Sequence, residues 1–84
     1  MNELVSINDA RKPKDGEECL VFTKSAYGKW YKIASFSENL SLVDGIYLCS
    51  KKYPGFYDYD SEFGFYEVTG VTHWMSLPDE PEEE

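Results

Sequence analysis

The chain has 84 residues, of which 42% are hydrophobic and 17% aromatic, and its formal net charge is −8. A chain of this length forms one domain that buries roughly 60–65% of its unfolded surface, and its apolar content argues against global disorder. The acidic balance repels phosphate backbones, which disfavours a direct nucleic-acid partner.

The N-terminal residues show no targeting segment. Met1–Val5 contains neither a basic nor an apolar region, and no apolar run approaches the roughly 20 residues of a membrane-spanning helix. We therefore expect a cytoplasmic protein without a membrane partner. Cys19 and Cys49 each adjoin an apolar run and are expected to be free, buried thiols. Two cysteines and one histidine, all far apart, match no zinc spacing, so the sequence predicts no metal site and no cofactor.

The first segment of the chain ends in residue types that cap helices. Ser6, Asn8 or Asp9 can each begin a short helical turn that runs through Arg11. Pro13 would end this turn, because the residue before a proline avoids the α region. The sequence thus predicts a short N-terminal helical turn, followed by a tight turn at residues 14–16.

Five strands are predicted after that turn. They are Cys19–Thr23, Lys29–Phe36, Gly45–Ser50, Phe63–Val68 and Val71–Leu77. The second strand has aromatic residues on both faces, with Trp30 on one and Tyr31 on the other, so its buried face stays open. Gly64 marks a bulge or a close backbone approach in the fourth. Short strands with little helical periodicity predict a mainly β fold, a small curled, barrel-like antiparallel sheet of about five strands, with α+β as the second choice.

The segment from Tyr53 to Tyr66 holds seven of the fourteen aromatic residues and alternates rings with acids. If it were extended, its three acids would share one face and Tyr57 and Tyr59 the other. Two interpretations remain open: a hairpin arm that packs its rings on the sheet, or an interface for a basic protein partner. The candidate binding residues are Tyr53, Tyr57, Asp58, Tyr59, Asp60 and Glu62.

Two further chemical functions are suggested by particular residues: calcium binding and general-base catalysis. The acids at 58, 60 and 62 resemble the start of a calcium loop, but its sixth and twelfth positions hold Phe63 and Thr69 instead of glycine and glutamate. His73, the sole histidine, is the natural general base, yet the sequence contains no nucleophile elbow, catalytic cysteine context or phosphate-binding glycine loop beside it. We therefore expect no enzyme activity; a small hydrolase using His73 is the least favoured hypothesis.

Charge is unevenly distributed along the chain. Residues 1–56 carry eight bases and seven acids, whereas residues 57–84 carry nine acids and no Lys or Arg. The domain is predicted to end at residue 78, and residues 79–84 form an acidic tail. Solubility is the simplest explanation of this tail, and acidic mimicry of DNA, inhibiting a host or defence protein, is the alternative. The basic clusters at 11–14 and 51–52 are too small for a nucleic-acid surface.

The C-terminal motif carries a family resemblance. Its residues are Val71, Thr72, His73, Trp74, Met75, Ser76, Leu77 and Pro78, followed by Asp79, Glu80 and Pro81. This stretch resembles the signature V-T-H-W-M-P-L-P of the domain of unknown function 551 family, which comprises small phage, prophage and bacterial proteins. Residues 5–9, 13, 15–16 and 20–22 are similar to its N-terminal half. The chain departs from that pattern at Leu4 (usually tryptophan), at Ser76 (usually proline) and by one extra residue before Pro13.

The resemblance implies a phage or mobile-element origin and a single domain, and it carries over no catalytic residue, because the family has no established activity. Packing explains the motif economically: Trp74 would fill the core, His73 would satisfy a polar group at a sheet edge and Pro78 would stop strand pairing. The leading hypothesis is a non-enzymatic domain that binds a protein partner through residues 53–66, with the oligomeric state open.

Overall fold

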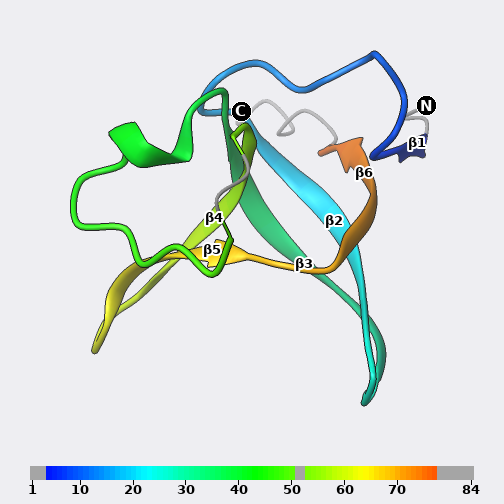
Figure 1. Ribbon diagram of the computed structural model, residues 1–84. Coiled ribbons are helices and arrows are strands. Elements are labelled where there is room, and N and C mark those ends of the chain that lie inside the picture. Colours follow the sequence, from blue (N-terminus) through cyan, green and yellow to red (C-terminus); the bar gives the residue numbers. More distant parts are fainter. Residues whose placement is uncertain (1–3, 51–52, 78–84) are drawn as a thin grey trace, which may run out of the picture.

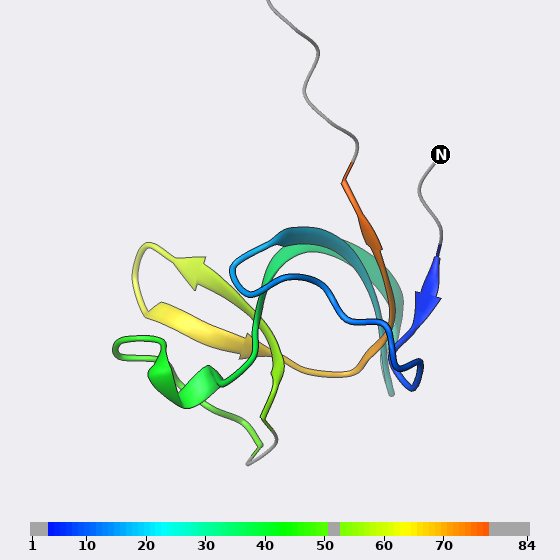
Figure 2. The same cartoon turned by 90° about the horizontal axis from the view of Figure 1, so that it is seen from above.

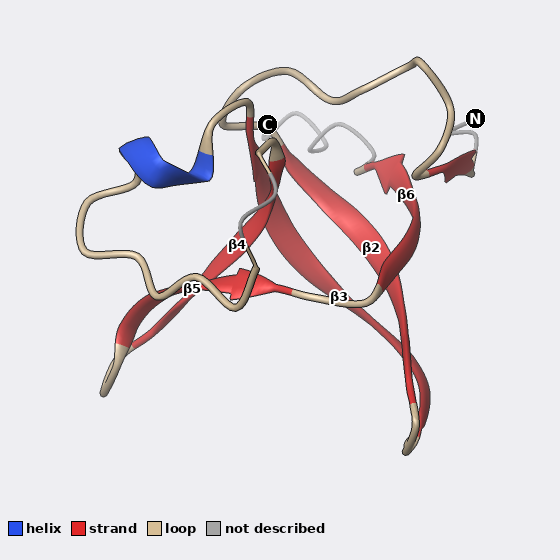
Figure 3. Cartoon of the chain, in the orientation of Figure 1, coloured by secondary structure: helices blue, strands red, loops and turns tan. Residues whose placement is uncertain are grey.

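Antiparallel strands dominate the computed structural model, which describes residues 4–50 and 53–77 (Figures 1 and 3). Its elements are β1 (Val5–Ser6), β2 (Glu18–Ser25), β3 (Gly28–Ser37), the 3-10 helix η1 (Leu40–Leu42), β4 (Gly55–Asp60), β5 (Gly64–Val68) and β6 (Val71–Ser76). One six-stranded sheet has the order β1-β6-β2-β3-β4-β5, and all of these pairings are antiparallel. The mainly β prediction is confirmed. Pro78 and the predicted acidic tail, 79–84, lie outside the described residues.

The sheet is open, with β1 and β5 at its two edges, so the predicted barrel-like closure is not observed. The β2–β3 ladder spans the whole of β2, but β3 meets β4 only where Ser35–Ser37 lie opposite Gly55–Tyr57. Beyond that short ladder the two hairpins diverge as separate arms (Figure 1). We call β2–β3 the first arm and β4–β5 the second arm. Seen from above, β4 and β5 lie at one side of the molecule and β1 and β6 at the other (Figure 2).

One face of the sheet forms the core. Its buried residues are Val5, Cys19, Val21, Ala34, Phe36, Phe56, Val68 and Trp74. On β3 the buried face is therefore the one that carries Ala34 and Phe36, which settles the choice that the sequence left open. The rings of Phe36 and Phe56 meet edge to face with centroids 5.3 Å apart, joining the two arms at their base.

The predicted N-terminal helical turn is wrong. Val5 and Ser6 form β1, in which Val5 lies opposite Trp74 of β6. The chain then turns, and the Asp9 N–H donates to the Ser6 carbonyl at 3.0 Å. Asp9 does accept a backbone hydrogen bond, from the Arg11 N–H at 2.8 Å, as a capping residue would. Such local bonds also satisfy the backbone in a turn, so they do not require a helix.

The predicted strand Gly45–Ser50 is a loop with one parallel bridge, between Tyr47 and Tyr66. The loop lies along the β5 edge: the Tyr47 N–H donates to the Phe65 carbonyl, and the Glu67 N–H donates to the Tyr47 carbonyl. The Glu67 carboxylate also accepts hydrogen bonds from the Cys49 N–H and from the N–H and hydroxyl of Ser50. These bonds cover part of a sheet edge that would otherwise be unpaired.

The two cysteines lie in different environments. Cys19 is fully buried in the core, as expected, and this burial raises the pKa of its thiol to about 12. Cys49 is exposed, which corrects the prediction that it is buried. Its apolar neighbours in the sequence belong to the loop that covers β5 and not to a core strand. No helix in the described part of the chain is long and apolar enough to cross a membrane.

Candidate functional site

Aromatic rings from both strands of the second arm gather on one of its faces. The register places Tyr59 directly opposite Phe65 and Tyr57 opposite Glu67, so the three rings share a face. The Phe65 ring meets Tyr59 at a centroid distance of 5.0 Å and Tyr57 at 5.8 Å, both edge to face. Tyr59 is nevertheless 59% exposed. These three residues, with Phe63, are called the ring cluster below.

Phe63 extends the ring cluster at the tip of the second arm, where it is 81% exposed. The tip is held by Asp60, whose Oδ1 accepts hydrogen bonds from the N–H groups of Glu62 at 2.7 Å and Phe63 at 3.1 Å. Phe63 and Phe65 also line a hollow of about 530 Å³ on the β5 side of the arm. Tyr47, Asp60 and Tyr66 complete its lining. The tip therefore presents an aromatic side chain next to a concave surface.

The other face of the second arm is tied to the first arm through Lys32. Its Nζ lies 2.9 Å from Asp58 Oδ2 and donates to the Tyr66 hydroxyl at 2.6 Å, and that hydroxyl donates to Asp58 at 3.3 Å. The Lys32 ammonium also lies 5.0 Å from the Tyr66 ring centroid. Partial burial acts to raise the pKa of Asp58, but the hydrogen bonds from Lys32, the Tyr59 N–H and Tyr66, together with the charge of Lys32, outweigh it, so this pKa falls below its usual value.

The structure gives the six predicted binding residues different positions. Tyr57 and Tyr59 lie in the ring cluster, whereas Asp58 points to the opposite face and pairs with Lys32. Asp60 holds the turn and Glu62 lies exposed within it, so the three acids do not form the common face expected of an extended strand. Tyr53 precedes β4, at the end of that strand away from the tip, and is joined to Pro54 by a cis peptide bond.

Three aromatic residues near the tip were missed as site residues. Phe63 and Phe65 flank Gly64, whose φ of +85° places the turn of the hairpin there. The turn glycine was a usable signal for Phe63, which lies in the turn and is exposed, whereas Phe65 is half-buried on β5. Tyr47 gave no signal, since only the folding of its loop along β5 brings it to this surface.

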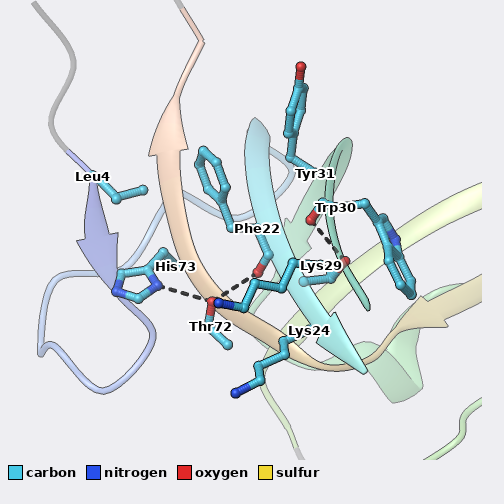
Figure 4. A pocket seen from close by; sticks show the side chains of 9 residues that line it. Leu4, Phe22, Lys24, Lys29, Trp30, Tyr31, Thr72 and His73 are labelled. Carbon is cyan, nitrogen blue, oxygen red and sulfur yellow. Dashed lines mark hydrogen bonds between the residues drawn. The ribbon is translucent and has the colours of Figure 1, made fainter. Parts of the chain in front are cut away.

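His73 lies on the face of the sheet opposite the core. Its Nδ1 is 3.0 Å from the Thr72 hydroxyl, which donates to the Phe22 carbonyl at 3.3 Å. This is the geometry of a hydrogen-bonded strand residue. Both side chains line a groove between β6 and the first arm (Figure 4). Across residues 4–50 and 53–77, no three His, Cys, Asp or Glu side chains gather closely enough to hold a metal ion.

The fold and this surface define a small mainly β domain with an open sheet and an aromatic patch on one projecting arm. The chain belongs to the family described as "Protein of unknown function (DUF551)", whose model matches residues 6–82. The match confirms the resemblance in the C-terminal motif and extends it over nearly the whole chain. Comparison with curated proteins found no match, and neither did comparison with solved structures.

Proposed function

We propose that this chain is a non-enzymatic domain that binds a protein partner through the ring cluster of its second arm. The observation that carries the proposal is the exposure of Tyr59 and Phe63, two large rings at the end of an arm that projects from the sheet. Contiguous exposed aromatic surface is a feature of protein–protein interfaces, in which tyrosine is enriched among the residues that contribute most to affinity.

The ring cluster is held in place before any partner arrives. Edge-to-face contacts fix Tyr57 and Tyr59 against Phe65, and the two hydrogen bonds to Asp60 fix the turn that carries Phe63. The ties from Lys32 to Asp58 and Tyr66 set the direction of the arm. A surface organised in this way loses little side-chain and loop entropy on binding, which favours affinity.

The biological setting forms part of the proposal. A phage or mobile-element origin, which the C-terminal motif suggested, is typical of small cytoplasmic accessory proteins that act on a host protein. Acidic mimicry of DNA is the weaker candidate, because Asp58, Asp60 and Glu67 are already engaged by groups of the chain itself. Of the nine acids from residue 57 onward, Asp58 is neutralised by Lys32, and the carboxylates of Asp60 and Glu67 have fewer free acceptor positions to offer to a DNA-binding protein.

Affinity capture with matched variants tests the proposal. The wild-type chain and Tyr27→Ala should recover the same host protein, since Tyr27 is 97% exposed at the tip of the other arm. The double variant Tyr59→Ala with Phe63→Ala should lose that protein while retaining the circular dichroism spectrum of the wild type. Recovery of the protein by the double variant, or its loss by Tyr27→Ala as well, would contradict the assignment. Unfolding of the double variant would show instead that these rings are part of the packing.

A further inference from the structure

Two lysines lie directly opposite each other near the tip of the first arm. Lys24 of β2 pairs with Lys29 of β3, and both are exposed. The Lys24 N–H donates to the Gly70 carbonyl at 2.9 Å, away from β3, so this is a non-hydrogen-bonded pair, in which facing side chains come closest. Like charges at such positions destabilise a sheet.

Neither lysine is neutralised within the described part of the chain. The ion pairs there join Arg11 to Asp9 and Lys32 to Asp58, and no carboxylate of residues 4–50 and 53–77 pairs with Lys24 or Lys29. The whole chain nevertheless contains 16 acids and only 8 bases. Intramolecular contacts in the described residues thus give no reason for placing two of these bases side by side.

The lysine pair stands at the end of an aromatic groove. The next residues on the same face, two positions along each strand, are Phe22 and Tyr31, whose ring centroids are 5.8 Å apart. Phe22 also lies opposite His73 of β6, so one row of rings crosses three strands. The groove measures about 440 Å³, and Figure 4 shows Lys24 and Lys29 beside these rings. Tyr31 is 67% exposed, which leaves its ring accessible to a ligand.

This combination specifies the chemistry of an occupant. Two ammonium groups attract carboxylates, and the neighbouring rings of Phe22 and Tyr31 offer a surface for an apolar or aromatic side chain. A long polyanion such as a nucleic acid would also meet the net charge of −8 of the whole chain, whereas a short acidic segment interacts mainly with the local pair. Charge complementarity therefore favours a peptide.

We infer that the groove between β6 and the first arm binds an acidic segment of a partner protein that carries an aromatic side chain beside its carboxylates. The carboxylates pair with Lys24 and Lys29, and the aromatic side chain packs on Phe22 and Tyr31. This surface lies on a different arm from the ring cluster and is independent of it. The domain would then hold two protein segments at once.

Fluorescence anisotropy with a short labelled peptide that alternates glutamate and tryptophan tests this assignment. The peptide should bind saturably, less tightly as salt is added, and more tightly than its counterpart with glutamine in place of glutamate. Lys24→Gln with Lys29→Gln should weaken binding by about tenfold, as expected for the loss of two partly screened ion pairs. Tyr31→Ala should also weaken it, whereas Tyr27→Ala should not.

Matched controls separate the groove from general charge effects. Lys51→Gln with Lys52→Gln makes the same change in net charge and should leave peptide affinity unaltered. Because Lys24→Gln with Lys29→Gln removes a like-charge contact, its melting temperature should equal or exceed that of the wild type, so lost binding would not reflect unfolding.

Four outcomes would overturn the inference. The first is equal affinity for the glutamate and glutamine peptides, and the second is unchanged affinity in the Lys24→Gln, Lys29→Gln variant. The third is tighter binding of a single-stranded oligothymidine through the same lysines, which would assign the groove to nucleic acid. The fourth concerns the chain's own acidic end: peptide binding that appears only after removal of residues 79–84 would identify that segment as the occupant. Unchanged affinity in the shortened chain supports a separate partner.

Discussion

At the scale of single residues, charge and burial decide what each side chain does. Lys32 lies on the core face of β3 and joins the two arms through Asp58 and Tyr66. Partial burial acts to lower the pKa of Lys32, but its hydrogen bonds to Tyr66 and Asp58 outweigh this and raise it. Each partner of the ion pair thus favours the charged form of the other, and the link between the arms depends on pH.

The sign of this pH dependence follows from the directions in which the pKa values of Asp58 and Lys32 shift. The pKa of Asp58 is lower in the folded state, so its contribution to stability is full above the ordinary aspartate value of about 3.9 and is lost as pH falls through the folded pKa. The raised pKa of Lys32 makes its contribution full below about 10.4 and lost at still higher pH. Asp58→Asn should therefore flatten the decline of the unfolding free energy in acid, measured by urea denaturation across pH. An unchanged acid slope would contradict the role given to this pair.

Trp74 illustrates burial at the same scale. It is 7% exposed and packs in the core, and its indole Nε1 is buried without a hydrogen-bond partner in the described part of the chain. Trp74→Ala should lower the unfolding free energy by about 3–5 kcal/mol, because it leaves a large cavity. Trp74→Phe should cost much less, since it keeps a ring and gives up no hydrogen bond. A loss for Trp74→Phe close to that for Trp74→Ala, measured by denaturant unfolding, would contradict this account of the Trp74 side chain.

At the scale of elements, turns and short ladders determine how the strands meet. The connection between β5 and β6 passes Gly70, which has a φ of +76° and lies against β2. A Cβ atom there would stand 2.6 Å from the Lys24 carbonyl oxygen. Gly70 thus permits both a left-handed conformation and a close backbone approach. The same approach allows the hydrogen bond from the Lys24 N–H to the Gly70 carbonyl.

Alanine substitutions at Gly45 and Gly70 distinguish backbone strain from steric overlap. Gly45 has a φ of +70° but open space around the position of a Cβ atom. Gly45→Ala should therefore lower the free energy of unfolding only by the roughly 1–2 kcal/mol that the left-handed conformation costs a residue with a Cβ atom. Gly70→Ala should lower the free energy of unfolding clearly more, because the left-handed strain and the steric overlap with the Lys24 carbonyl add. Thermal unfolding of both variants under one buffer condition measures the difference, and a larger loss for Gly45→Ala would contradict the close approach at Gly70.

At the scale of the whole molecule, the sequence predicted the strands whose side chains alternate or stay apolar and missed those that depend on distant partners. Cys19–Thr23 and Val71–Leu77 lie close to β2 and β6 as observed. β4 was missed because Pro54 and Gly55 read as a break, although they lie at its start. The segment Gly45–Ser50 has a strand-like composition, but the hydrogen bonds that the N–H groups of Cys49 and Ser50 donate to the Glu67 carboxylate hold it as a loop.

Only part of the candidate site could be predicted from the sequence. An aromatic segment was evident from residues 53–66, yet composition does not determine which rings a hairpin exposes. The register of β4 against β5 decides that, because it sets Tyr59 beside Phe65 and turns Asp58 toward Lys32. The open sheet, in which β3 leaves β4 after three residues, is what makes the second arm project. Such divergence is a property of tertiary pairing and is not encoded in a local pattern.

Calorimetric titration of the host protein captured by this chain tests the central claim most directly. Truncation of a ring that anchors an interface costs about 2 kcal/mol or more, so removing two such rings in Tyr59→Ala with Phe63→Ala should weaken binding by about a thousandfold. Tyr27→Ala should bind as the wild type does, since its ring stands on the other arm. Equal affinities for the wild type and the folded double variant would contradict the assignment of the ring cluster as the binding surface.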